Sequence, residues 1–252
     1  KSHLDFCAVT GHAMWPDMYE KAPGTEFVVN FHLEGFKKLQ DHWKEIRKEV
    51  AEANSEDFVT FQGYELHSRE YGDHHLISID DELPLIYRDS PEELVKDCGK
   101  DAIAIPHHIG YTPDYRGIDW KKFKESNSPV VEVFSKHGCS MSEDADYPYY
   151  HNMGPRDTRN MVDEGLRQGH KFGFVASTDH HAGFPGSYGD GMAAVLAEEK
   201  TRESIWEAIK ARRTYAVTGD RILCDFKIND AWMGSEITGN VRRVKARIET
   251  EG

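Results

Sequence analysis

The sequence has few cysteines, no long apolar run and no excess of positive charge, and each absence excludes a class of protein. Its four cysteines, at positions 7, 98, 139 and 224, form no C-x-x-C spacing and require no disulfide framework. No apolar stretch approaches the roughly 20 residues that cross a bilayer, so we expect no membrane span. A formal net charge of -13 argues against a general electrostatic footprint for nucleic acid or an anionic membrane.

Apolar runs alternate with helical patterns along most of the 252 residues, a length that suffices for one hydrophobic core. Apolar residues at three- and four-residue steps predict a long helix over 31–53. Ser90-Pro91-Glu92-Glu93 predicts a capping box that opens a short helix. Two further helices are expected over 159–168 and 201–213. The alternation predicts an α/β fold with a mostly parallel sheet over residues 1–221.

The pattern changes after Arg221. Residues 223–228 and 241–248 alternate between apolar and polar side chains, as strands of a half-exposed antiparallel sheet do. We therefore predict a small C-terminal β appendage over residues 222–252.

The segment Ala176-Ser177-Thr178-Asp179-His180-His181 combines an apolar strand with metal-binding side chains. Divalent metals accept carboxylate and neutral imidazole as ligands. Asp179 and His181 are two residues apart, so they point to the same side of an extended chain. A solvated polar loop could contain the same residues. Whether this segment forms a metal site or such a loop is therefore judged from the ends of the other strands.

Four other segments place a histidine or a glutamate beside an apolar run. An acidic residue within such a run is rarely buried unless it is paired or bound to a metal. The recurrence of this pattern in one chain predicts a polynuclear metal centre. The residues concerned are His12, Glu65, His74-His75, His107-His108 and Glu132.

These motifs, in this order, resemble those of the PHP (polymerase and histidinol phosphatase) superfamily of metal-dependent hydrolases. They are Thr-x-His after the first strand, Gly-x-Glu, a histidine at a strand start, Pro-His and Ser-x-Asp-x-His. Residues 201–205, 212–219 and 228–234 resemble one branch of the superfamily that is defined by a domain of unknown function. The resemblance implies a distorted, incomplete (β/α)7-type barrel.

The resemblance also implies a metal centre that holds one to two divalent ions, Zn, Mn or Fe. Glu65 would bridge two ions, and Glu65, Asp179 and His181 would act in catalysis. The ligands implied by position are His12, Glu65, His75, His107, Glu132, Asp179 and His181.

Two of these ligands come from adjacent histidine pairs. His75 is preferred to His74 because the superfamily's ligand directly precedes an apolar strand. His107 is preferred to His108 because the ligand there follows its strand immediately.

The chain departs from the superfamily pattern at two places. Gly11 stands where the superfamily has aspartate, and the opening His-x-His motif has no counterpart before Leu4. Either the chain is a fragment of a longer protein, or this protein has lost two ligands. No signal peptide is recognisable, so the cytoplasm is the default compartment, although a missing front would conceal such a peptide.

A small anionic substrate is expected at this centre. Lys136 and His137 follow the Glu132 strand, where a cation would stabilise a phosphate oxygen, and Arg116 is a further candidate. An ordinary solvated side chain is the alternative for Lys136. The loop 143–156 is rich in aromatic residues and is long enough to cover a substrate, although such loops also occur without a function.

Metal-assisted hydrolysis is the mechanism that these residues suggest. Two ions bridged by Glu65 would lower the pKa of a shared water and neutralise charge on substrate oxygens. A phosphate ester is the first choice of substrate. The alternatives are an amide or another ester on the same fold, or an inactive binding module that has lost ligands. The sequence leaves the substrate, the metal and the oligomeric state open.

Overall fold

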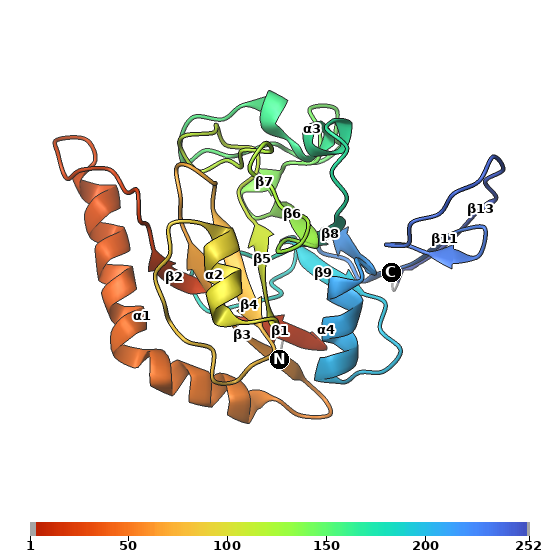
Figure 1. Ribbon diagram of the computed structural model, residues 1–252, viewed down its shortest axis with the longest axis horizontal. Helices are drawn as coiled ribbons and strands as arrows, with labels where there is room; N and C mark the ends of the chain where they lie inside the picture. Colours follow the sequence, from red (N-terminus) through yellow and green to blue (C-terminus); the bar gives the residue numbers. More distant parts are fainter. Residues whose placement is uncertain (1–3, 251–252) are drawn as a thin grey trace.

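The computed structural model describes residues 4–250 and shows a mixed α/β protein (Figure 1). The strands are β1 (Phe6–Ala8), β2 (Gly11–Met14), β3 (Val59–Leu66), β4 (His74–Ser78), β5 (Ala102–Pro106), β6 (Val130–Ser135), β7 (Gly138–Cys139), β8 (Gly173–Ala176), β9 (Met192–Val195), β10 (Thr214–Val217), β11 (Ile222–Ile228), β12 (Ala231–Trp232) and β13 (Val244–Thr250). The helices are α1 (Glu26–Ala53), α2 (Pro91–Cys98), the 3-10 turn η1 (Thr158–Asn160), α3 (Val162–Arg167) and α4 (Arg202–Lys210).

The strands form four separate sheets. The central sheet has the order β1-β3-β4-β5, and β2 continues along the same edge of β3 as β1. β1 and β2 run parallel to β3, whereas β4 is antiparallel to both β3 and β5. The other sheets are β7-β6-β8, β10-β9 and β12-β11-β13.

This arrangement confirms the α/β class and corrects the expected strand directions. Among the described strands, the pairs β1–β3, β2–β3 and β6–β8 are parallel, and the other pairings are antiparallel. The (β/α)7-type barrel is not confirmed, because the sheets are separate and β3, β4 and β5 follow one another without a covering helix between β3 and β4.

All four expected helices form with shifted ends, and the one expected over 201–213 is α4. α1 begins at Glu26, one turn before the predicted start, and its buried stripe includes Phe36, Leu39 and Trp43. α2 follows the predicted cap, in which the Ser90 side chain accepts a hydrogen bond from the backbone N–H of Glu93. The segment predicted over 159–168 is divided between η1 and α3.

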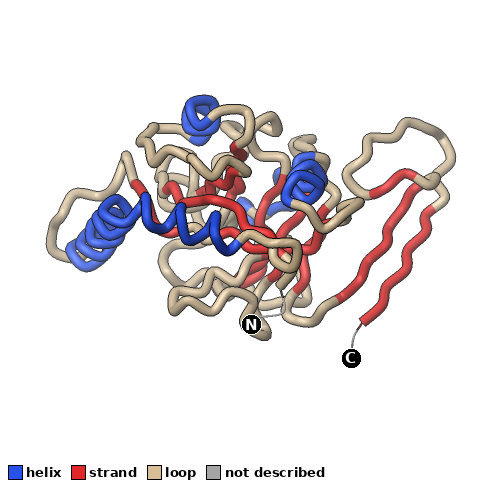
Figure 2. The backbone as a smooth tube through the Cα atoms, turned by 90° about the horizontal axis from the view of Figure 1, so that it is seen from below, coloured by secondary structure: helices blue, strands red, loops and turns tan. Residues whose placement is uncertain are grey.

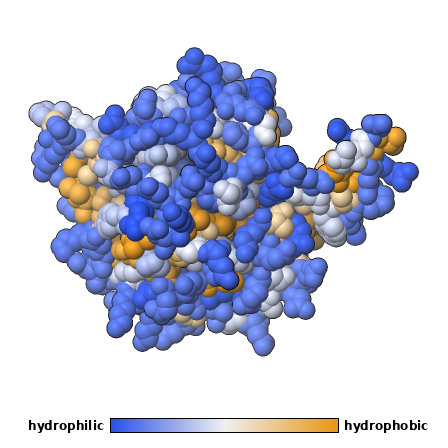
Figure 3. Space-filling view, in the orientation of Figure 1, coloured by the Kyte–Doolittle hydropathy of each residue, from blue (hydrophilic) through white to orange (hydrophobic). Residues whose placement is uncertain are grey.

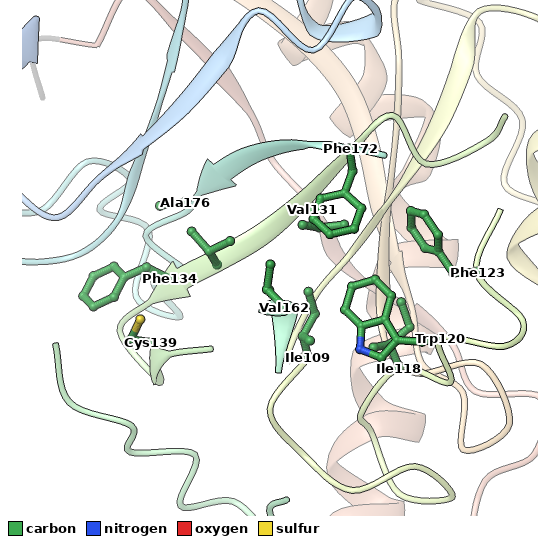
Figure 4. Close-up of a cluster of buried hydrophobic side chains, with 11 residues drawn as sticks. Ile109, Ile118, Trp120, Phe123, Val131, Phe134, Cys139, Val162, Phe172 and Ala176 are labelled. Carbon is green, nitrogen blue, oxygen red and sulfur yellow. The ribbon is translucent and has the colours of Figure 1, made fainter. Parts of the chain in front are cut away.

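Apolar side chains fill both faces of the central sheet. α1 covers one face through a cluster that includes Leu39, Trp43 and Tyr64, and α4 packs near β3 through Trp206. A third cluster lies between β6, β8 and the loop before β6. It contains Ile109, Ile118, Trp120, Phe123, Val131, Phe134, Val162 and Phe172 (Figure 4).

The β11–β13 hairpin projects from the rest of the chain as an arm (Figures 1 and 2). Its strands pair antiparallel from Ile222 opposite Thr250 to Ile228 opposite Val244, so the second strand begins at Val244 and not at residue 241 as predicted. Every described residue of β13 is exposed. Most of the visible surface is hydrophilic, with apolar patches over α1 and on the arm (Figure 3). Within residues 4–250, no helix has the length and apolarity that a membrane crossing requires.

Candidate metal centre

Strand register brings three of the predicted ligands into one row. His12 on β2 lies opposite Glu65 on β3, and Glu65 lies opposite His75 on β4. Directly opposed residues on neighbouring strands present their side chains on the same face of the sheet. His12 Nε2 is 3.8 Å from Glu65 Oε2. The sequence pattern predicted that His12 and Glu65 follow their strands, but His12 lies within β2 and Glu65 within β3.

His107 extends this row from the end of β5. Its Nε2 is 3.9 Å from Glu65 Oε1, and its ring centroid is 4.1 Å from that of His75. His107 Nδ1 donates a hydrogen bond to Glu132 Oε1 over 2.7 Å. Glu132 Oε2 accepts a second hydrogen bond from the Ser177 hydroxyl. Glu132, predicted as a ligand, therefore uses both oxygens to hold neighbouring side chains, and it orients His107 Nε2 toward Glu65.

Asp179 joins the second sheet to this group. It follows β8, and its Oδ2 lies 3.6 Å from His107 Nε2, 3.2 Å from His108 Nε2 and 3.0 Å from His137 Nε2. His181 Nδ1 is 3.8 Å from Asp179 Oδ1. Asp179 and His108 both have left-handed backbones, with φ of 49° and 55°. Such conformations are costly for these residues and persist only where the surroundings impose them.

Glu65 Oε1 and His107 Nε2 face each other at the centre, and both are buried without a hydrogen-bond partner. His137 Nε2, 3.0 Å from Asp179 Oδ2, is another such atom. A buried acceptor without a partner costs free energy, and His107 Nε2 carries a lone pair because its Nδ1 holds the proton. Imidazole and carboxylate together form the donor set that Zn, Mn and Fe accept. The residues present therefore fit a divalent metal ion.

Burial shifts the pKa of the central groups in the direction of their neutral forms. Desolvation, reinforced by Asp73, raises the pKa of Glu65 well above its ordinary value. Desolvation and the neighbouring His108 hold the pKa of His107 well below its ordinary value. Burial also lowers the pKa of His12 to about 2 and that of His75 to about 3. His12, His75 and His107 are thus neutral near pH 7, which is the state that binds a metal. His108 differs, because burial lowers its pKa but hydrogen bonds to Asp179 and Asp73 outweigh burial and raise the pKa to about 9.

A buried ion pair between Arg116 and Asp73 contacts the histidines of the centre. Arg116 Nε donates to Asp73 Oδ2 over 2.6 Å, and both side chains are almost fully buried. Burial alone would raise the pKa of Asp73, but Arg116 and His67 outweigh it and hold the pKa well below its ordinary value. Asp73 Oδ2 also contacts His67 Nδ1 at 3.1 Å and His108 Nδ1 at 3.2 Å. Asp73 therefore connects Arg116 to two histidines of the centre.

In two of the three adjacent histidine pairs, the structure directs one histidine away from the centre. His74 points away from the row, and its Nδ1 contacts the Gly72 carbonyl at 2.9 Å. His180 also turns away, because its Nδ1 accepts hydrogen bonds from the backbone N–H groups of Ala182 and Phe184. At the 107–108 pair both histidines contact Asp179, so the geometry does not favour one of them alone.

The predicted substrate-binding residues lie in different environments. His137 contacts Asp179 and is half-buried, and Lys136 beside it is also half-buried. Arg116 was expected to contact substrate, but its guanidinium is committed to Asp73. The loop 143–156 packs against the His137 turn, where the backbone N–H of His151 donates to the His137 carbonyl over 2.8 Å.

Three residues of the site were not identified from the sequence, and two of them carried a detectable signal. His67 lies two residues after Glu65, so an extended chain places both on one side. His32 falls within the apolar stripe of α1, where a histidine is unusual. Asp73 gave no comparable signal, because it precedes the His74-His75 pair that already explained its segment. His108 was considered only as the alternative to His107, but the structure places both beside Asp179.

Sequence comparisons fit a domain of unknown function. The family model described as "Protein of unknown function (DUF3604)" matches residues 187–228. A protein of Chlamydia pneumoniae, described as uncharacterized, is 31% identical over 224 residues, and one of Chlamydia muridarum is 28% identical over 225 residues. Each match covers 79% of this chain but 35% of the relative, so the chain spans about a third of the length of the curated relatives it matches.

Among solved structures, the chain is similar to a two-domain protein of Bacteroides vulgatus that contains a predicted PHP-like metal-dependent phosphoesterase. The TM-score is 0.46 and the identity is 16%, over 86% of this chain and 56% of that chain. What this chain does is therefore inferred from its own side chains.

Proposed function

We propose that this chain is a metal-dependent hydrolase that acts on a small phosphorylated substrate. The observation that carries the proposal is the meeting of Glu65, His107 and Asp179, which come from β3, the end of β5 and the end of β8. His107 Nε2 joins them, since it lies 3.9 Å from Glu65 Oε1 and 3.6 Å from Asp179 Oδ2, and both His107 Nε2 and Glu65 Oε1 are buried without a hydrogen-bond partner. The proposal assigns the hydrolase to residues 1–221 and leaves 222–252 as a β extension.

Glu65, His107 and Asp179 would hold the ion directly. The remaining candidate ligands surround them, and they are His12, His75, His108, His137 and His181. When bound there, a divalent ion such as Zn, Mn or Fe lowers the pKa of a coordinated water and neutralises charge on a phosphate.

The chain's own side chains would position the substrate and the ligands. Glu132 fixes the Nδ1 proton of His107 and so keeps Nε2 available. Lys136 is half-buried and adjoins His137 in the chain, and it would pair with a phosphate oxygen. Arg116 acts through Asp73 and is a positioning residue. Loop 143–156 lies against His137, which suits a segment that limits access of water to the substrate.

Hydrolysis of model esters tests this function. Protein stripped with a chelator and reconstituted separately with Zn²⁺, Mn²⁺ or Fe²⁺ would be assayed on p-nitrophenyl phosphate, bis-p-nitrophenyl phosphate, p-nitrophenyl acetate and an anilide. We expect phosphate-ester hydrolysis that requires metal and disappears in Asp179→Ala, with His180→Ala as the matched control. Turnover of only the acetate or the anilide would favour the other hydrolase class. Stoichiometric metal binding without hydrolysis would favour an inactive binding module.

A further inference from the structure

A second group of histidines lies on the α1 side of Glu65. His12 on β2, His32 on α1 and His67 after β3 each offer a ring nitrogen, and these nitrogens lie within 4.8 Å of one another. Their ring centroids are 4.7 to 5.2 Å apart. His32 and His67 are 3% and 0% exposed, and the indole of Trp15 packs over both. Three imidazoles therefore meet in a pocket that is largely closed to water.

The protonation state of His32 follows from its hydrogen bond. His32 Nδ1 lies 2.7 Å from the carbonyl oxygen of Val28, one turn earlier on α1. A carbonyl oxygen only accepts, so Nδ1 carries the proton and Nε2 of the neutral ring has a lone pair. Nε2 is buried and has no hydrogen-bond partner. α1 thus presents an unused donor atom to the pocket.

His67 is arranged in a similar way. Its Nδ1 lies 3.1 Å from Asp73 Oδ2, and its Nε2 lies 3.0 Å from His12 Nδ1. A carboxylate that accepts the Nδ1 proton leaves the Nε2 lone pair directed at His12, which is the arrangement seen behind many metal-binding histidines. Arg116 is 3.4 Å from the same Nδ1, but Asp73 compensates its charge at 2.6 Å.

We propose that His12, His32 and His67 form a second metal site, separate from the Glu65–His107–Asp179 centre and suited to Zn²⁺. Ligand nitrogens at about 2.0–2.1 Å from a tetrahedral ion lie about 3.3 Å apart, close to the 3.0 Å between His12 and His67. The third ligand atom, on His32, lies within 4.8 Å of the other two. Three neutral imidazoles with an open fourth position are an established zinc ligand set.

His12 lies between the two sites. Its Nδ1 faces His67, whereas its Nε2 is 3.8 Å from Glu65 Oε2 on the opposite side of the ring. Without an ion, the His12 Nδ1 proton is donated to His67 Nε2. The second ion would take the place of this proton, and neutral His12 would then carry its proton on Nε2, which faces Glu65. This site does not depend on the proposed hydrolysis, because none of its nitrogens needs the substrate or Asp179.

Zinc stoichiometry tests the proposal. Chelator-stripped protein would be loaded with Zn²⁺, passed through gel filtration and analysed for metal per chain. We expect His32→Ala to hold one zinc fewer than the wild type, and Asp179→Ala to lose a different ion, so that the double variant loses both. His42→Ala, an exposed histidine on the same helix, is the control and should bind as the wild type does.

Anomalous diffraction at the zinc edge from wild-type crystals locates the ion without any variant. The expected result is a peak about 2.0–2.2 Å from His12 Nδ1, His32 Nε2 and His67 Nε2. A folded His32→Ala with the wild-type zinc count, or no peak at this position, would overturn the second site. Failure of the hydrolase centre would instead be seen as a wild-type zinc count in Asp179→Ala.

Discussion

Glu65 Oε1 and His107 Nε2 lie 3.9 Å apart, and both are buried without a hydrogen-bond partner. Glu132 holds His107 in this orientation through a 2.7 Å hydrogen bond to the other ring nitrogen. The fold therefore directs an acceptor and a lone pair at one point instead of pairing them. A divalent ion bound between them would satisfy both atoms.

Replacement of Asp179 by alanine should abolish metal-dependent hydrolysis and leave the fold intact. The side chain contacts three histidines, and it is not part of an apolar cluster. We expect a loss of roughly 100-fold or more, at the upper end of what loss of metal-site partners costs. Assays on bis-p-nitrophenyl phosphate with circular dichroism check it. His180→Ala should stay close to the wild type, and equal damage from His180→Ala and His181→Ala would refute the assignment of Asp179 and His181.

Glu132→Gln should weaken metal binding without unfolding the chain. The amide keeps the size of the side chain but removes the charge that holds the His107 Nδ1 proton. Loss of such a partner typically costs about 10- to 100-fold in metal affinity. Competition with a chromophoric chelator measures the affinity. Glu45→Gln, an exposed change on α1, should leave it unchanged, and an unaltered affinity in Glu132→Gln would argue against the orienting role.

The Asp73–Arg116 pair should dominate the stability of this region. Removal of one partner from a buried ion pair leaves a charge without compensation, so Asp73→Ala should cost about 3–5 kcal/mol in the free energy of unfolding. Asp73→Ala combined with Arg116→Met should cost less than the sum of the single changes. Urea unfolding measures all three. The exposed Lys37–Asp41 pair is the control, and Asp41→Ala should cost at most about 1 kcal/mol. Strict additivity would contradict coupling.

The same pair predicts a pH dependence of stability. The pKa of Asp73 is held well below its ordinary value of 3.8, so the folded state binds this proton less readily than the unfolded state. The contribution is then fully present above about pH 4 and is lost as the pH falls below it. Urea midpoints of the wild type and Asp73→Asn should therefore converge on acidification. If the difference between the two urea midpoints grew as the pH fell, the predicted direction of the Asp73 pKa shift would be wrong.

Gly117→Ala should destabilise the loop that carries Arg116. A Cβ at this position would lie 1.7 Å from the carbonyl oxygen of Tyr111, which the backbone cannot accommodate without moving. Overpacking of this kind costs about 1–3 kcal/mol or more. Gly239→Ala is the matched control, because its Cβ would meet only an ordinary contact at 3.9 Å. Similar urea midpoints for the two variants would show that the Gly117 loop has room to adjust.

The sequence predicted which side chains come together better than it predicted the strand directions. His12, Glu65, His75, His107 and Asp179 could be found because each lies in or beside an apolar strand, and the structure brings them together. Whether they bind a metal stays a prediction.

The fold was less predictable because strand direction depends on pairing between distant segments. β3 and β4 have the same apolar pattern in a parallel or an antiparallel sheet, and only the short connection between them favours the antiparallel hairpin that forms. His32 was hidden for a related reason. Its neighbours on α1 indicate a core-facing stripe, and nothing local shows that His67 lies across from it.

The most direct test of the account is an anomalous difference map from crystals grown with Mn²⁺ or Zn²⁺. The account predicts an ion within about 2.0–2.3 Å of Glu65, His107 Nε2 and Asp179, with Glu132 still bonded to His107 Nδ1. A map without a peak at this position, in crystals of protein that keeps Glu65, His107 and Asp179 in contact, would contradict it.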